Sequence, residues 1–352
     1  MKNKKIFFVI ICVLLILGCI SLYMILTKDD KINNNDNNNK TTTTTTTTPK
    51  KLSIVDEDSK TRPYAVMINN HSTARKYHAG LQDAYIVYEF IVEGGITRFL
   101  ALFRDVNVEK IGSVRSARHY FLDYALENDA IYVHWGWSPQ AESDIKKLKI
   151  NNINGLTYEG TYFYRDKELK NLKVSTEHTG FTNTEMLDTA AKKLKYNRDM
   201  NKELLLNYSV DDINLNNKEN AILANNVVIK YSNGFKSSYV YDKENMVYKR
   251  FVNDKEHTDY GTKKQYTFKN IITYQVKNYT IKGDTSGRQE FENIGSGTGY
   301  YITNGYAVKI NWKKESRSSQ TKYTYEDGTE INVNDGNTFI QIQPMNQELT
   351  IS

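Results

Sequence analysis

The sequence predicts an α+β protein: a mixed α/β N-terminal domain followed by a mainly antiparallel β domain, behind an N-terminal membrane anchor and a disordered stalk. Three observations support this. The chain has 352 residues, 39% of them hydrophobic, which is enough for two cores of ordinary size. It contains 26 tyrosines but only four prolines, a composition that favours strands. Short β-branched and aromatic runs alternate with helical patterns in the first part and dominate the second.

Residues 1–26 have the features of a membrane anchor. Three lysines, Lys2, Lys4 and Lys5, precede a charge-free and mostly apolar run at 6–26, which at about 1.5 Å per residue is just long enough to span a bilayer core. The positive residues should stay inside the cell, so the body should face the extracytoplasmic side of the cell membrane. The run is either an uncleaved transmembrane helix or a signal peptide ending in a lipobox at 16–19, with lipid attached to Cys19.

Residues 27–52 predict a disordered stalk. The segment is rich in asparagine and contains eight consecutive threonines, with almost no apolar side chain to compensate for the entropy of ordering it. A chain of this kind reaches a few nanometres from the bilayer. We therefore expect it to hold the folded body within the cell wall.

The segment 53–217 is predicted to be the mixed α/β domain. Ser138-Pro139 is a helix start with an N-cap and an N1 proline, and Thr182 with Glu185 forms a capping-box pattern. The predicted helices lie at 117–127, 139–148 and 186–196, and the predicted strands at 64–69, 85–92, 97–104 and 131–134.

The segment 218–352 is predicted to be the β domain. Alternating apolar runs are separated by clusters of glycine, asparagine and aspartate, which are typical of turns. The clearest predicted strands lie at 227–231, 271–276, 300–303, 307–312 and 339–342.

Residues 85–104 are predicted to form a hairpin about a two-residue turn at Gly94-Gly95, because glycine adopts positive φ without steric cost. This turn pairs Glu93 with Ile96 and places Glu89, Glu93 and Arg98 on one face. The three charges are either a structural ion-paired triplet or the wall of a cleft in which partial burial raises the pKa of the carboxylates. Glu89 and Glu93 would lie about 13 Å apart on one strand, too far for a glycosidase pair, so we consider Glu93 alone as acid and base.

The segment 114–119 predicts an anion-binding site. Ser116 is a suitable N-cap for the following helix, and Arg115 and Arg118 lie on either side of it. Free helix N–H groups and two guanidinium groups could then converge on one phosphate, carboxylate or sulfate group. The alternative is that both arginines form structural ion pairs with nearby acidic residues.

Further polar and aromatic candidates follow predicted strands, at the sheet edge where sites of α/β domains gather. They are Asn70, His71, His134 and His178, together with Trp135 and Trp137, which could stack on a sugar ring or lie in the core. A histidine such as His178 could transfer a proton or bind substrate. No metal-ligand spacing occurs, so we expect neither a metal nor a cofactor.

Composition excludes several other classes. Both cysteines, Cys12 and Cys19, lie in the first twenty residues, so the body has no disulfide, thiolate zinc site or cysteine nucleophile. The net charge of +6 includes the three anchor lysines, and a nearly neutral body is a poor candidate for nucleic-acid binding.

The stretches at 62–71, 88–103, 112–139 and 152–156 closely resemble the N-terminal domain of the DUF3048 family, the YerB-like lipoproteins of Gram-positive bacteria, and the β-rich remainder resembles that family's C-terminal domain. The resemblance implies export and two domains but no activity. The region 111–118 also resembles LytR-CpsA-Psr phosphotransferases, although Ser116 stands where that family has an acidic residue after the arginine.

The leading functional hypothesis is a membrane-tethered protein that acts on cell-wall glycan, possibly by cleaving peptidoglycan strands. Glu93 would be the acid and base, Glu89 and Arg98 would tune it, and Arg115 and Arg118 would bind an anionic substituent. One alternative is phosphotransfer from a lipid-linked donor. Another is a non-catalytic scaffold that binds an anionic wall polymer or an envelope protein.

Overall fold

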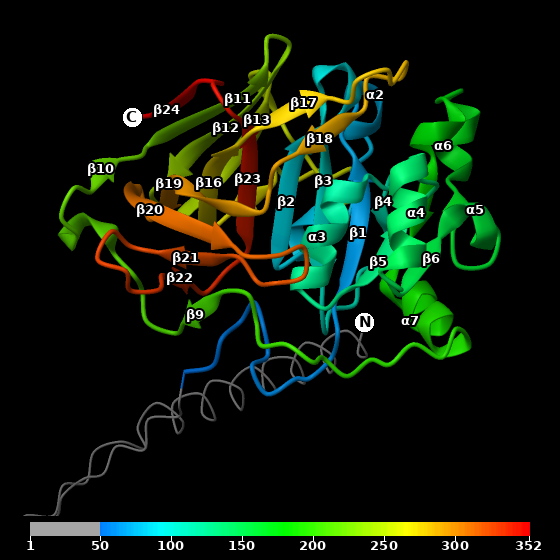
Figure 1. Ribbon diagram of the computed structural model, residues 1–352, viewed down its shortest axis with the longest axis horizontal. Coiled ribbons are helices and arrows are strands. Elements are labelled where there is room, and N and C mark those ends of the chain that lie inside the picture. The colour runs from blue at the N-terminus through cyan, green and yellow to red at the C-terminus, as the bar shows by residue number, and fades with distance from the viewer. Residues whose placement is uncertain (1–49) are drawn as a thin grey trace, which may run out of the picture. The chain divides into compact units, whose positions relative to one another are not determined.

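One large mixed sheet contains strands from both halves of the sequence (Figure 1). The computed structural model describes residues 50–352, which form one compact unit. The strand order of the large sheet is β10 (Ile222–Leu223), β20 (Tyr306–Lys314), β19 (Gly295–Thr303), β16 (Asn270–Val276), β23 (Thr338–Pro344), β2 (Ile86–Ile91), β3 (Thr97–Phe103), β1 (Tyr64–Asn69), β5 (Ile131–His134) and β6 (Asn152–Asn154). Strand β21 (Lys322–Thr324) pairs with β20 outside this order. The strands predicted from the sequence are all present, and the α+β class is confirmed.

Strand β23 joins the two halves of this sheet. It is parallel to β2 on one side, where Ile86 pairs with Thr338, and parallel to β16 on the other, where Asn270 pairs with the same residue. Most buried apolar residues of both halves form one continuous cluster, and a small separate cluster contains Ala79, Leu169 and Phe181. The segments 53–217 and 218–352 therefore share a core as well as a sheet.

A second sheet packs against one face of the first. It contains β14 (Lys255–Glu256), β13 (Val247–Val252), β12 (Phe235–Asp242), β11 (Asn226–Ser232), β24 (Leu349–Ile351) and β15 (Thr267–Phe268). Strand β11 alternates buried and partly exposed residues, as expected for a sheet with one covered face. Tyr239 of β12 lies edge-on to Phe339 of β23, with ring centroids 6.0 Å apart.

Shorter strands complete the β structure at the margins. Three groups pair apart from the two larger sheets: β4 (Ile111–Gly112) with β8 (Gly180–Thr182) and β7 (Tyr164–Arg165), β9 (Asn207–Ser209) with β22 (Asn332–Asn334), and β17 (Asn278–Thr280) with β18 (Gln289–Phe291).

The helices gather mainly around β1, β5 and β6 (Figure 1). They are α2 (Ser72–Arg75), α3 (His119–Glu127), α4 (Pro139–Lys147), α5 (Gly155–Tyr158), α6 (Lys167–Asn171) and α7 (Thr184–Lys193), with 3-10 turns η1 (Leu81–Asp83), η2 (Glu93–Gly95), η3 (Thr176–His178) and η4 (Leu215–Asn217). The predicted cap of α4 is confirmed, because the Ser138 side chain accepts a hydrogen bond from the Ala141 N–H. The predicted capping box of α7 is wrong: Asn183 is the N-cap, and the Thr182 hydroxyl donates to Tyr162 O instead.

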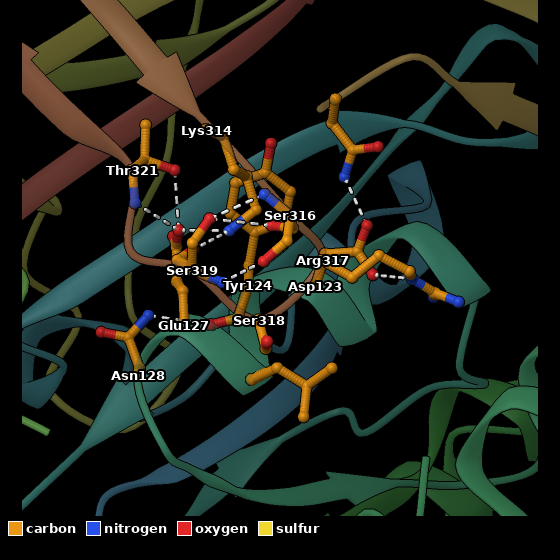
Figure 2. A network of polar contacts seen from close by, with 12 residues as sticks. Asp123, Tyr124, Glu127, Asn128, Lys314, Ser316, Arg317, Ser318, Ser319 and Thr321 are labelled. Atoms are coloured by element: carbon orange, nitrogen blue, oxygen red, sulfur yellow. Dashed lines mark hydrogen bonds and ion pairs between the residues drawn. The ribbon is translucent and has the colours of Figure 1, made fainter. Parts of the chain in front are cut away.

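A polar network holds the loop between β20 and β21 onto helix α3 (Figure 2). The fully buried Glu127 carboxylate accepts hydrogen bonds from the Lys314 ammonium at 2.8 Å and from the Thr321 hydroxyl at 2.7 Å. Arg317 contacts both Asp123 and Asp144 at 2.6 Å. The loop is therefore fixed by charged groups from two helices.

The predicted anchor at 1–26, including Cys19, lies outside the described residues, as does most of the predicted stalk. Within residues 50–352, no helix is both long and apolar enough to cross a membrane.

Candidate functional site

The hairpin of β2 and β3 has a different register from the predicted one. Glu93, Gly94 and Gly95 form a three-residue loop closed by a hydrogen bond from Val92 N to Ile96 O, and both glycines have φ of 71°. Including Glu93 in the loop shifts the pairing by one residue, so that Phe90 lies opposite Arg98. A shift of one residue moves side chains to the other face of a strand.

As a result, Glu89 and Arg98 point to opposite faces of the sheet, and the predicted triplet of charges on one face is wrong. Arg98 lies on the face covered by α3 and donates a hydrogen bond to Ser116 O at 2.7 Å. Glu89 lies on the face covered by the second sheet and has no exposed surface. Only Glu93 and Arg98 of the three remain neighbours.

Glu93 is the acceptor in a two-point contact with Arg118. The distances from the guanidinium nitrogens to the two carboxylate oxygens are 2.5 and 2.9 Å, and Arg98 lies 3.8 Å from the same carboxylate. Burial alone would raise the pKa of Glu93, but the hydrogen bonds and charge of Arg118, together with the charge of Arg98, lower it below the ordinary value. The prediction of a raised carboxylate pKa is therefore wrong for Glu93.

Arg115 brings a third guanidinium group to this position. Its backbone N–H donates to Met67 O of β1, and its carbonyl accepts from Trp135 N after β5, so two neighbouring strand ends hold it. Its side chain makes one long contact, 3.4 Å to Glu177 O. Burial is the main cause that lowers the pKa of Arg115, and the charge of Arg118 also lowers it. The charges of Glu177 and Glu93 act in the opposite direction but do not cancel the shift.

The three arginines exceed the negative charge available to them. The Glu93 carboxylate contacts Arg98 and Arg118, its charge also acts on Arg115, and Glu177 is exposed at the margin. Burial and the neighbouring charge of Arg118 lower the pKa of Arg98 to about 9. Such crowding of like charges disfavours the charged form of the guanidinium groups. An additional anion would relieve this repulsion. We refer to Glu93, Arg98, Arg115 and Arg118 as the arginine site.

Two stacked histidines lie next to this site. The rings of His71 and His178 are 4.9 Å apart and nearly parallel, and the Asn69 side chain contacts His178 Nδ1 at 2.8 Å. Burial lowers the pKa of His178; the charge of Glu177 opposes this shift, and the charges of His71 and Arg115 add to it. His178 is therefore neutral at physiological pH and able to hydrogen-bond a ligand.

Ser116 does not cap a helix. Arg118 is the N-cap residue of α3, without a side-chain cap, and the Ser116 hydroxyl donates to Trp135 O at 3.0 Å. The predicted contribution of a helix N-terminus capped by Ser116 is wrong, whereas the predicted proximity of Arg115 and Arg118 is found.

Other predicted residues are used in packing. His134 is buried between Gly136 O and the Asn152 side chain. Trp135 is 6% exposed, lies against Gly155 and Gly180, and carries the Arg165 guanidinium 3.8 Å above its ring. Its ring is thus covered on the sides where a sugar could stack. Trp137 is half-buried next to His134.

Glu89 has a partner that the sequence analysis missed. The guanidinium of Arg250, from β13, contacts its carboxylate at 3.0 Å, and neither residue has exposed surface. Thr97, Ser237 and Asn70 also donate to Glu89. The sequence contains one signal for this partner. Arg250 stands between Tyr248 and Val252 in an alternating strand, at a position where the alternation predicts a side chain that points into the core. Glu89 and Asn70 are therefore interior residues that bind the two sheets together.

A histidine pair lies beside this buried ion pair. His78 Nδ1 and His257 Nε2 are 2.8 Å apart, and both residues are buried. Burial lowers the pKa of His78 to about 3, and burial together with the charge of His78 lowers that of His257 well below its ordinary value. Arg75 and Arg250 reinforce both shifts, while Asp259 opposes the shift of His78.

This pair predicts acid sensitivity. Both histidines are neutral in the folded state, whereas unfolded histidine binds a proton below pH 6.5, so stability is complete above that pH and falls as the pH decreases from there toward the folded value. The contribution of His78 alone should make the free energy of unfolding roughly 3 kcal/mol lower at pH 4.5 than at pH 7. Urea unfolding at both pH values should show this difference, and His78→Gln should reduce it. An unchanged difference in that variant would assign the effect to other groups.

Three hollows lie away from the arginine site. Their volumes are about 790 Å³ along β16 and β19, 560 Å³ between α3, α4 and β18, and 720 Å³ beside β1 and α7. Among residues 50–352, no group of three or more histidine, cysteine or acidic side chains is arranged to hold a metal ion.

Comparison with known proteins agrees with this architecture. Residues 51–197 match the family model described as "Protein of unknown function (DUF3048) N-terminal domain", and residues 227–340 match the corresponding C-terminal domain. The chain is 32% identical to "Putative lipoprotein YerB" of Bacillus subtilis (strain 168) over 292 residues, which cover 81% of this chain and 82% of that protein. The crystal structure of the YerB protein from Bacillus subtilis superposes with a TM-score of 0.70 at 29% identity, covering 82% of this chain and 94% of that one. The protein described here therefore belongs to the DUF3048 family.

Proposed function

We propose that the protein is a membrane-tethered, non-catalytic receptor that binds anionic groups of a cell-wall polymer at the arginine site. The observation that carries this proposal is the excess of guanidinium groups. Arg98 and Arg118 both contact the Glu93 carboxylate, whereas the Arg115 side chain has one long hydrogen bond, to Glu177 O, and only feels the charge of Glu93. Guanidinium groups in a half-buried position bind phosphate and carboxylate strongly, because their N–H donors match the oxygens of these anions.

Binding fits this site better than cleavage of glycan strands. A general acid must hold a proton near neutral pH, whereas the contacts of Glu93 with Arg118 lower its pKa. Glu89 is enclosed with Arg250 and cannot reach a substrate. A Glu93-dependent transglycosylase reaction would require Arg118 to move away first.

Phosphotransfer from a lipid-linked donor would use the same arginines to hold a pyrophosphate. The family that carries out this reaction places an acidic residue directly after the arginine, where this chain has Ser116. The Ser116 hydroxyl is already bonded to Trp135 O. We therefore treat pyrophosphate as a possible ligand and not as a substrate.

The N-terminal sequence and the name of the relative support the proposed tether. That Bacillus subtilis protein is described as a lipoprotein, and Cys19 of this chain follows Ile16-Leu17-Gly18, the order of a lipobox. A lipid on Cys19, or an uncleaved helix at 6–26, would hold the body on the extracytoplasmic face of the membrane. Incorporation of labelled palmitate that disappears in Cys19→Ala would favour the lipid.

The arginine site can be tested by co-sedimentation of the unit Lys50–Ser352, which contains the whole described core, with purified wall sacculi. Arg115→Gln should weaken binding about tenfold, because a charged hydrogen bond contributes about 1.5 to 3 kcal/mol. Binding should also weaken with added salt. Sacculi stripped of phosphate polymers distinguish phosphate from peptide carboxylate as the source of the anion.

Arg288→Gln is the matched control, since Arg288 is an arginine of the β17–β18 hairpin already paired with Asp284 at 2.8 Å. It should bind sacculi like the unmodified protein. Equal binding by Arg115→Gln and Arg288→Gln would contradict the proposal.

A further inference from the structure

The 790 Å³ cleft lies where strands β16 and β19 separate. Their ladder ends at the pair Tyr274 and Gly299. Beyond that pair, β16 continues to Val276 and β19 extends back to Gly295, but the two segments are no longer paired with each other. The cleft opens between them, and residues 273–277 and 294–300 form its walls.

The separated strands leave part of the sheet's backbone unpaired. Residues 295–298 pair with β20 on one side only, so alternate residues of this segment direct their N–H and C=O groups toward the cleft. Gly295 has nothing within 4 Å of its missing side chain, which leaves the entrance open. The cleft therefore offers amide donors and acceptors from a strand edge.

The side chains in the walls are mostly uncharged. Hydroxyl and amide groups line one face of the two strands: Thr273, Gln275, Ser296, Thr298 and Tyr300. Apolar side chains, including the half-exposed Ile294 and Met345, lie at the rim. The charged pair there, Lys277 and Glu292, neutralises itself at 2.7 Å. The cleft consequently has little attraction for ions.

Among the residues that the structure describes, two polar groups in the walls have no hydrogen-bond partner. They are the Thr273 hydroxyl and the indole N–H of Trp312, in side chains that are 0% and 5% exposed. A buried polar group without a partner costs about 1 to 3 kcal/mol, and such groups are rare in native proteins. Both atoms are buried beneath the cleft surface, so a bound group can hydrogen-bond with them only where the wall shifts.

We propose that this cleft binds an N-acetylated saccharide, as a second site independent of the arginine site. An acetamido group carries the same donor and acceptor as a peptide unit and can pair with the exposed backbone of β19. Its methyl group suits the apolar rim at Ile294 and Met345. Ring hydroxyls match the uncharged polar row, and Tyr300 offers an aromatic surface for a sugar face.

The test uses the unit Lys50–Ser352 labelled with ¹⁵N in tryptophan, titrated with the tetramer of N-acetylglucosamine. The indole N–H signal of Trp312, assigned by its loss in Trp312→Phe, should shift on binding, whereas those of Trp135 and Trp137 should not. Tyr300→Ser should weaken binding about tenfold. Tyr279→Ser changes a half-exposed tyrosine of the neighbouring strand β17 outside the cleft, and it should bind within about twofold of the unmodified protein.

A second variant keeps the test decisive if Tyr300→Ser unfolds. Thr298→Arg adds a long side chain at an exposed position in the wall, and it should abolish the Trp312 shift without loss of stability. Arg115→Gln should bind the tetramer normally, which separates this site from the arginine site. An unmoved Trp312 signal at millimolar saccharide, or a shift that only a free wall peptide produces, would overturn the proposal.

Discussion

Arg250→Met is expected to lower the free energy of unfolding by about 3 to 5 kcal/mol, because it leaves the Glu89 carboxylate buried without a counter-charge. Both residues are fully enclosed between the two sheets, and the guanidinium approaches Glu89 Oε2 at 3.0 Å. Thr97 and Ser237 would still donate hydrogen bonds to Glu89, but they cannot balance its charge. Urea unfolding followed by circular dichroism measures the loss.

Lys249→Met provides the control for this change. Lys249 precedes Arg250 on β13 and points to solvent, with 46% of its side chain exposed. Its replacement should leave the urea concentration at the unfolding midpoint nearly unchanged, because exposed ion pairs contribute little to stability. The double variant Glu89→Gln with Arg250→Met should regain part of the loss, since no lone charge remains. A loss in Arg250→Met no larger than that in Lys249→Met would show that the buried pair does not behave as described.

Lys314→Met should also lower the free energy of unfolding by about 3 to 5 kcal/mol, because it leaves the Glu127 carboxylate buried without a counter-charge. The Lys314 ammonium is the cation that contacts Glu127, and both side chains are fully buried. The hydrogen bonds from Thr321 and Tyr88 to Glu127 remain in the variant. The loop between β20 and β21 should also loosen, because this contact is one of those that hold it on α3 (Figure 2).

Lys313→Met is the companion control, since the Lys313 side chain is 63% exposed and pairs with Glu315 at the surface. It should unfold at nearly the same urea concentration as the unmodified protein. Amide hydrogen exchange of the loop should rise in Lys314→Met and stay constant in Lys313→Met. Equal exchange in both variants would contradict a clamping role for Lys314.

Local features of the fold could be predicted from the sequence, because they depend on neighbouring residues. Short β-branched and aromatic runs predicted β1, β3 and β5, an alternating run predicted β16, and Ser138-Pro139 predicted the start of α4. The segment 182–185 was misread because Asn183 competes with Thr182 for the same capping role. Periodicity cannot decide between two adjacent residues that are both good N-caps.

The candidate site was only partly predictable, because its geometry depends on one loop. A two-residue turn and a three-residue loop are both compatible with Gly94-Gly95, and the choice decides whether Arg98 faces α3 or the second sheet. The proximity of Arg115, Arg118 and Glu93 requires β1 and β5 to lie side by side. The partner of Glu89 comes from 161 residues away, a distance at which sequence patterns carry no pairing information.

The position of β23 constrains how the protein can be made. Every residue up to Pro344 must be available before the large sheet can close, since β23 lies between β2 and β16. A nascent chain emerging from its N-terminus thus holds β2 with one unpaired edge until Pro344 has been synthesised. Contacts so distant in sequence slow folding, and exposed edges invite aggregation in the meantime. Loss of the chain from residue 338 onward would consequently expose two strand edges in the centre of the molecule, and a nonsense mutation there should be as damaging as one far upstream.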